Sequence, residues 1–188
     1  LYNKVESFKL LPANIDLVRF KYASSLFDSE QYSKAVNIFS KIDHSNLSKN
    51  EINDYYFRFG YSYMSLGQFK HSLALFENLI ELPNNKFTNP SIYYTGYIHY
   101  LNKEFDSAIS FFSKLINDPR FSLSSRYYIL ESNFMLQNYS YVTQNGEVLY
   151  DILTNELKTR TARVLSEAFF AQNNTQKARL YFEKYSMV

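Results

Sequence analysis

Apolar residues recur along the chain at a nearly constant spacing, with polar stretches between them. One recurring position is occupied by Phe39, Phe76, Phe112, Gly146 and Phe182. Successive members of this set are 37, 36, 34 and 36 residues apart. The position four residues earlier is mostly small and holds Ala35, Ser72, Ala108, Val142 and Ala178. A period of this length, kept along the whole chain, is typical of a repeat architecture.

Within one period, the pattern predicts two helices joined by a turn. A polar pair such as Gly67-Gln68 marks the turn, and a small residue such as Gly60 lets the second helix approach the first closely. In the second helix, the small residue and the aromatic residue lie one helical turn apart on the same face. Pro83 and Pro119 end second helices, because proline cannot continue a helix. The chain therefore reads as one helix-turn-helix unit used five times.

The predicted repeats cover residues 16–52, 53–88, 89–122, 123–158 and 159–188. Residues 1–13 read as the second helix of a preceding unit, because Pro12 predicts the same kind of break as Pro83, and we expect the array to begin earlier in a longer protein. The fourth repeat is the least regular: Leu130 replaces the small residue and Gly146 the aromatic residue, so different packing is expected there. The predicted fold of residues 1–188 is an all-α, right-handed α-solenoid of about five hairpins plus a partial N-terminal one.

These spacings resemble the tetratricopeptide repeat, whose units carry a small residue, a turn, an aromatic residue, then Ala and Phe, then Pro. The resemblance covers about residues 16–188 and is most specific in the second and third units. It implies a stacked array with an extended concave face. The tyrosine-rich sequence of these units, such as NDYYFRFGYSYMSLGQF, is also similar to long tetratricopeptide arrays of Bacteroidota envelope proteins. That second resemblance implies a bacterial scaffold facing the periplasm or cell envelope.

Composition supports a folded helical chain and argues against nucleic acid as a partner. Hydrophobic residues make up 46% of the 188 residues and aromatic residues 19%, which is enough material for a core. Gly 4 and Pro 4 are few for a protein built from many tight turns. Lys+Arg 20 nearly balance Asp+Glu 18, whereas nucleic-acid binding depends on concentrated positive charge. The same balance disfavours a helical-repeat RNA reader, although its period would be similar.

The residues that usually carry catalysis or hold metals show no motif. Cys 0 excludes disulfides and thiolate chemistry, and the three histidines lie in different repeats. His99 occupies a place that faces inward in the preceding repeat, which favours a core role. The carboxylate pairs Glu77/Glu81 and Glu147/Asp151 lie on second helices, where a solvated face is the usual outcome. We therefore predict no enzyme activity, no metal and no cofactor. No apolar stretch is long enough for a membrane span, and the sequence leaves the cellular compartment open.

The first helices are expected to line the concave face, which makes their inward positions candidate contacts for a partner. Eight such positions carry Phe20, Phe57, Tyr61, Met64, Tyr93, Tyr97, Tyr100 and Tyr127. Glu131, Arg163 and Glu167 fall near the C-terminal end of this groove. Aromatic rings are typical binding anchors, but rings at helical spacing also form cores. Both interpretations stay open at the level of sequence.

Three functions are compatible with these observations. The first is a non-enzymatic protein–protein interaction scaffold that binds a peptide or protein partner in the aromatic groove. The second is a carbohydrate-binding envelope scaffold, in which tyrosine rings stack on sugar faces. The third is a structural spacer within a larger tetratricopeptide protein, in which the aromatic residues are wholly buried. We favour the first, because the aromatic residues occupy groove positions in addition to packing positions.

Overall fold

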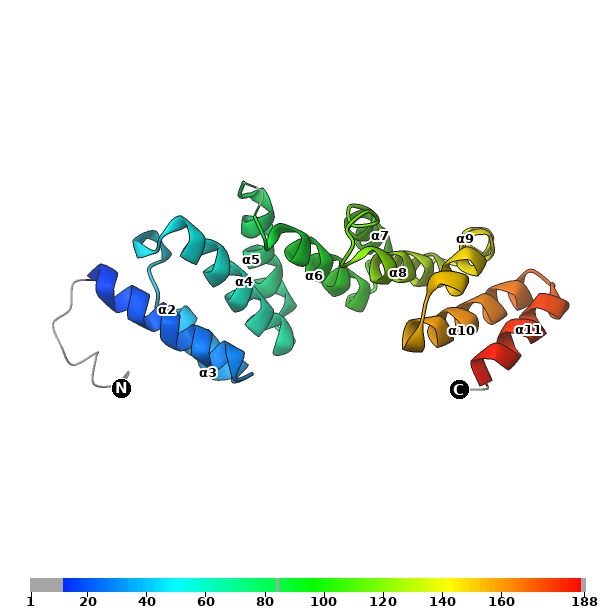
Figure 1. The fold of residues 1–188 in the computed structure, drawn as a ribbon, viewed down its shortest axis with the longest axis horizontal. Coiled ribbons are helices and arrows are strands. Elements are labelled where there is room, and N and C mark those ends of the chain that lie inside the picture. The colour runs from blue at the N-terminus through cyan, green and yellow to red at the C-terminus, as the bar shows by residue number, and fades with distance from the viewer. Residues whose placement is uncertain (1–11, 84, 187–188) are drawn as a thin grey trace. The chain divides into compact units, whose positions relative to one another are not determined.

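A computed structural model describes residues 12–83 and 85–186, and every regular element in them is helical (Figure 1). The all-α prediction is therefore confirmed. Residues 1–11, most of the predicted preceding unit, lie outside the described residues. Helix α2 begins at Pro12. Proline is tolerated there because the first turn of a helix needs no intrahelical N–H bond.

Backbone contacts divide the chain into two units, Leu1–Ser91 and Ile92–Val188. The described helices of the first unit are α2 (Pro12–Asp28), α3 (Tyr32–Phe39), α4 (Lys49–Ser65) and α5 (Phe69–Glu81), with a short 3-10 turn at His44–Asn46. Helix α2 packs against α3, α3 against α4, and α4 against α5. Two antiparallel hairpins therefore stack in this unit.

The second unit contains most of α6 and all the later helices. The elements are α6 (Thr88–Leu101), α7 (Phe105–Ser113), α8 (Ser122–Met135), α9 (Tyr139–Ile152), α10 (Asn155–Ala171) and α11 (Thr175–Ser186). Gly96 of α6 lies against Phe111 and Phe112 of α7, and α8 contacts both α7 and α9. Helix α10 packs against α8, α9 and α11, which stacks the last hairpin on the one before it.

Each hairpin turns through one residue with a left-handed backbone. These residues are Glu30, Gly67, Lys103, Gln137 and Asn173, with φ between 57° and 71°. The next residue donates its N–H to a carbonyl five positions earlier, as Gln68 does to Tyr63 at 2.9 Å and Asn138 to Asn133 at 2.8 Å. This bond satisfies a carbonyl that the helix end leaves free. The predicted polar pairs are thus the turns, and only Gly67 adopts this conformation without a steric cost.

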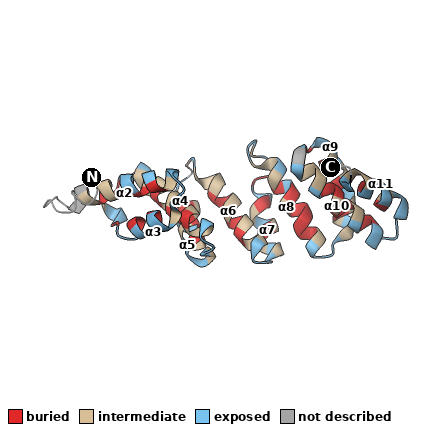
Figure 2. Ribbon diagram, turned by 90° about the horizontal axis from the view of Figure 1, so that it is seen from below, coloured by how far each residue is buried: buried red, intermediate tan, exposed pale blue. Residues whose placement is uncertain are grey.

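The recurring aromatic position is buried in the first three repeats. Phe39, Phe76 and Phe112 have no exposed surface, and the small residues one turn before them are also fully buried. Phe39 lies 5.5 Å from Phe59 and Phe112 lies 5.1 Å from Tyr128, between ring centroids, so in these two repeats the next first helix completes the packing. Figure 2 shows buried residues concentrated on first helices such as α8 and α10, with exposed residues along α9 and α11. The core therefore follows the first helices of each unit.

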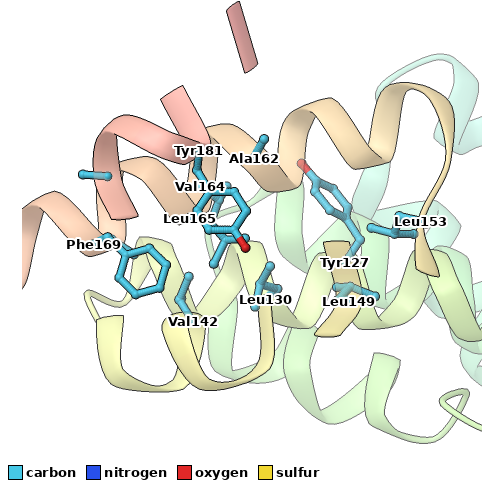
Figure 3. Close-up of a cluster of buried hydrophobic side chains, with 12 residues drawn as sticks. Tyr127, Leu130, Val142, Leu149, Leu153, Ala162, Val164, Leu165, Phe169 and Tyr181 are labelled. Atoms are coloured by element: carbon cyan, nitrogen blue, oxygen red, sulfur yellow. The ribbon is translucent and has the colours of Figure 1, made fainter. Parts of the chain in front are cut away.

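The fourth repeat forms an ordinary hairpin but fills its core differently, as expected from Gly146. Leu165 of α10 occupies the space in which the other repeats place a ring. A Cβ atom on Gly146 would lie 2.7 Å from Leu165 Cδ2 and 3.4 Å from Leu130 Cδ1. In Figure 3, Leu165 lies among Leu130, Val142 and Tyr181. The loss of the aromatic residue is compensated from the following helix.

Candidate partner-binding surface

In the first unit, three of the four predicted groove residues keep part of their surface. Phe57, Tyr61 and Met64 lie on α4 and are half-buried, whereas Phe20 of α2 is only 7% exposed. Phe20 packs in the core with Leu26 and Phe39. It therefore offers no surface to a partner in this structure, and its aromatic side chain serves packing.

Tyr61 belongs to a small aromatic group on this unit. Its ring lies 5.6 Å from Phe27 and 5.9 Å from Tyr32, centroid to centroid. Arg58 covers Phe27, with its guanidinium carbon 5.0 Å from the ring centroid, and also pairs with Asp54 and Asp28. A guanidinium held over a ring contributes a cation–π attraction. Tyr61 is thus the half-exposed edge of an aromatic group that is bordered by the ion pairs of Arg58 with Asp28 and Asp54.

In the second unit, the predicted residues of α6 form one continuous group with a tyrosine of α8. Tyr97 lies 6.4 Å from Tyr100 and 5.5 Å from Tyr128, and Tyr100 lies 5.1 Å from Tyr128, between ring centroids. Tyr93 joins the group at 6.3 Å from Tyr128. All four side chains are half-buried. We call Tyr93, Tyr97, Tyr100 and Tyr128 the tyrosine cluster.

Position 127 behaves differently from its neighbour. Tyr127 is fully buried and belongs to the core with Leu130 and Leu149, while Tyr128 stacks on Phe112 at 5.1 Å and keeps part of its surface. The sequence analysis assigned the groove place to Tyr127 and missed Tyr128. Successive side chains of a helix point about 100° apart. An error of one residue in the predicted groove position therefore selects the buried Tyr127 and misses the half-exposed Tyr128.

Charged groups border the tyrosine cluster. Arg163 of α10 donates to Glu131 at 3.1 Å and to Glu167 at 2.9 Å, and Glu131 is only 8% exposed. Burial and the neighbouring Glu131 carboxylate raise the pKa of Tyr100 to about 12. Glu131, Arg163 and Glu167, which the sequence analysis expected only near the C-terminal end of the groove, therefore place one cation between two carboxylates near Tyr100.

The raised pKa of Tyr100 predicts a loss of stability at alkaline pH. A tyrosine ionises at about 10 in an unfolded chain, so folding favours the protonated phenol of Tyr100. Its contribution is fully present below pH 10 and is lost as pH rises toward 12. Tyr100→Phe should therefore reduce the fall in unfolding free energy across this window. Urea unfolding followed by circular dichroism at the two ends of the window measures this change. An unchanged alkaline slope would contradict the buried environment of Tyr100.

Two of the remaining candidates for chemistry, His99 and Glu147, have structural partners. His99 stacks on Phe111 at 5.3 Å and contacts the Glu104 carboxylate. Glu147 binds Lys177 at 2.6 Å and accepts from the Tyr181 hydroxyl at 3.0 Å. Hydrogen bonds from Lys177 and Tyr181 lower the pKa of Glu147. Among the described residues, no group of three or more His, Cys, Asp or Glu could hold a metal ion, and no helix is long and apolar enough to cross a membrane.

Two hollows of the second unit were not predicted from the sequence. One, of about 460 Å³, lies between α7, α8 and α9, with Ile109, Ile129 and Val148 in its lining. The other, of about 730 Å³, lies between α10 and α11 and includes Phe170 and Phe182. No sequence motif marks either of them, because their linings come from different helices.

Comparison with known proteins supports the repeat interpretation. Residues 54–86 match the tetratricopeptide repeat family model. A search of the curated proteins gives no match. The family model thus identifies one repeat, which is the second one predicted from the sequence.

Solved structures extend this result to nearly the whole fold. A MamA structure, labelled AMB-1, has a TM-score of 0.76 at 15% identity, covering 92% of this chain and 91% of its own. The structure of tetratricopeptide-like repeats of a putative kinesin light chain from Podosopora anserina has a TM-score of 0.68 at 13% identity, and the match covers 96% of both chains. At these identities, the likeness establishes the tetratricopeptide-type α-solenoid fold. It does not bear on the Bacteroidota resemblance, which stays a prediction.

Proposed function

We propose that this tetratricopeptide-repeat chain is a non-enzymatic scaffold that binds a peptide or protein partner through half-buried aromatic residues of its first helices. The tetratricopeptide fold is in general a scaffold for protein–protein interaction. Within it, the proposed contacts are Phe57, Tyr61 and Met64 in the first unit and the tyrosine cluster in the second. Phe20 and Tyr127 are not among the proposed contacts, because they are buried.

The tyrosine cluster is the observation that supports this proposal most strongly. Each ring packs on its neighbours with centroids 5.1–6.4 Å apart, so the rings are held in place before any partner arrives. Rigid aromatic side chains lose little conformational entropy on binding. Tyrosine also combines an apolar face with a hydroxyl that bonds to water or to a partner. A half-buried group of this kind has the properties of an interaction hot spot.

The charges beside the cluster favour a polypeptide as partner. Arg163 and Glu167 both keep exposed surface, with 34% and 51% of their side chains accessible. A peptide can place an apolar side chain on the rings and a backbone or charged group against this pair. We therefore propose a peptide with aromatic or aliphatic anchors.

Selection from a random-peptide display library tests the proposal. Peptides enriched on the parent chain should bind a Tyr97→Ala/Tyr100→Ala variant about tenfold more weakly or worse, because each lost anchor is worth about 1 kcal/mol or more. Fluorescence anisotropy with the selected peptides measures the change. Tyr185→Ala is the matched control, since Tyr185 is a 40% exposed tyrosine of α11 outside the cluster.

The same experiment separates the alternatives. Equal affinity for the parent chain and the folded double variant would place binding elsewhere. No enrichment at all would favour one of the two other functions, a spacer or a carbohydrate-binding scaffold. Helical circular dichroism of each variant excludes loss of fold as the cause of weaker binding.

A further inference from the structure

The hollow of about 460 Å³ between α7, α8 and α9 is bordered along the chain by α6 before it and α10 after it. Its lining is mainly aliphatic and comes from all three helices, with Ile109 on α7, Ile129 on α8 and Val148 on α9. Val148 is 68% exposed, and Ile152 at the end of α9 is 53% exposed. A hollow of this volume, with an apolar lining and a few polar groups, has the properties of a small-molecule site.

The repeat pattern shows why this space is open. Two places, twelve residues apart, face each other across each hairpin. In the fifth repeat they hold Phe169 and Tyr181, whose rings stack at 5.9 Å between centroids. The fourth repeat instead holds Asn133 and Asn145. The other three repeats hold large aliphatic or aromatic side chains, namely Leu26 and Ile38, Tyr63 and Leu75, and His99 and Phe111.

The second of these places also fills the gap to the preceding second helix. Tyr181 of α11 reaches α9, where its ring lies 5.5 Å from Tyr150 and its hydroxyl donates to Glu147 at 3.0 Å. Its equivalent in α9 is Asn145, 36 residues earlier. The Asn145 amide donates to the Tyr141 carbonyl oxygen of its own helix at 2.9 Å. This short side chain does not fill the space toward α7, and the hollow results.

An amide and a guanidinium belong to the α8 part of the lining. Arg126 and Asn133 lie on the same face of α8, two helical turns and about 10 Å apart. Asn133 is only 7% exposed. It donates to the Ile129 carbonyl at 2.9 Å and accepts from the Asn138 amide at 3.0 Å. Because an amide has two N–H donors and two lone pairs, Asn133 keeps capacity for one further donor and one further acceptor.

Arg126 gives the other end of the hollow a positive charge. Among the described residues, every other arginine pairs with a carboxylate at 2.5–3.4 Å. Within the same part of the chain, Arg126 donates only to the Ile116 carbonyl oxygen, at 3.4 Å. The described residues that line the hollow include no Asp or Glu. The guanidinium therefore keeps N–H groups for an anion, and their fork matches a carboxylate.

We propose that this hollow binds a small aliphatic carboxylate that carries a hydroxyl at its far end. The carboxylate would pair with Arg126, and the aliphatic body would lie on Ile129 and Val148. The hydroxyl would bond to the amides of Asn133 and Asn145. This site shares no residue with the tyrosine cluster and does not depend on the proposed function.

The probe is ω-hydroxydecanoate, in which an aliphatic chain separates the two polar groups by about the distance from Arg126 to Asn133. Titrated into the methyl-labelled chain, it should produce saturable shifts in the methyl resonances of Ile109, Ile129 and Ile152. Nuclear magnetic resonance detects affinities down to the millimolar range, so a weak complex is still seen. The absence of a saturable shift would refute the site.

A charge variant tests the choice of a carboxylate. Arg126→Gln should weaken the binding of ω-hydroxydecanoate about fivefold, because a charge-assisted pair is lost. The same variant should leave the affinity for the uncharged decanediol unchanged. Arg179→Gln is the matched control, since 83% of the Arg179 side chain is exposed on α11, outside the hollow. Equal losses for the acid and the diol, or no loss for the acid, would contradict the assigned ligand class.

A filling variant tests the location. Asn145→Tyr copies the residue of the fifth repeat, and the fold should survive because Asn145 is exposed. The new ring should occupy the hollow and abolish the ligand-induced shifts with both the acid and the diol. Circular dichroism checks that the helical content is kept. Binding that persists in this variant, or shifts that map to α10 and α11, would place the ligand elsewhere and overturn the proposal.

Discussion

Phe112→Ala is expected to lower the free energy of unfolding by about 3–5 kcal/mol, whereas Phe182→Ala should change it by less than about 1 kcal/mol. The two residues occupy the same place in their repeats. Phe112 has no exposed surface and packs on Tyr128 and Ile129, whereas Phe182 is 57% exposed. Removing the buried ring costs its transfer free energy and leaves a cavity, and removing the exposed ring costs neither.

Urea unfolding followed by circular dichroism at 222 nm measures both variants against the parent chain. The pair is matched in substitution, in helix type and in repeat position, so burial is the main difference. Repeat arrays can lose cooperativity, and the unfolding midpoint and slope are therefore compared together. Similar losses for the two variants would mean that Phe182 is covered in solution.

The fold was predictable because its signals are local and repeat five times. The polar turn pairs, the buried small residues and the aromatic position all follow from helical spacing and occur where expected. Helix starts were less accurate: α4 begins at Lys49, four residues before the predicted repeat boundary. The signal was present, since Ser48 and Glu51 form a capping box in which each side chain bonds the other backbone N–H.

The candidate surface was only partly predictable, because exposure depends on neighbouring helices. Phe20 and Phe57 occupy the same repeat place, yet Phe20 is buried by its packing with α3 and Phe57 is half-buried. Tyr128 belongs to the cluster through its contacts with Tyr97 and Tyr100 of another hairpin, which no spacing rule includes. The hollow beside Phe182 was missed for a related reason. A repeat pattern assigns the same core role to every copy, whereas Phe182 is 57% exposed in the structure.

Gly146→Phe, which restores the aromatic residue of the repeat, is expected to destabilise the chain by about 2–3 kcal/mol. A Cβ atom added at this position would lie 2.7 Å from Leu165 Cδ2 and 3.1 Å from Leu165 Cγ. Leu165 and Leu130 are 0% and 1% exposed, so a whole ring has no free space to enter. Replacing a glycine inside a helix gains about 1 kcal/mol, which offsets only part of this strain. Thermal and urea unfolding of the variant measure the net loss.

Two further variants test whether contact with Leu165 causes this loss of stability. Gly146→Ala should stay within about 1 kcal/mol of the parent chain, because the gain in helix propensity balances a small shift of the Leu165 side-chain end. Leu165→Ala in the Gly146→Phe background should recover stability, since it reopens the space that the ring needs, although Leu165→Ala alone is destabilising. Additive losses in the double variant would contradict direct compensation between these positions. Recovery would show that Leu165 replaces the missing ring, and that the fourth repeat keeps its packing through a residue of the fifth.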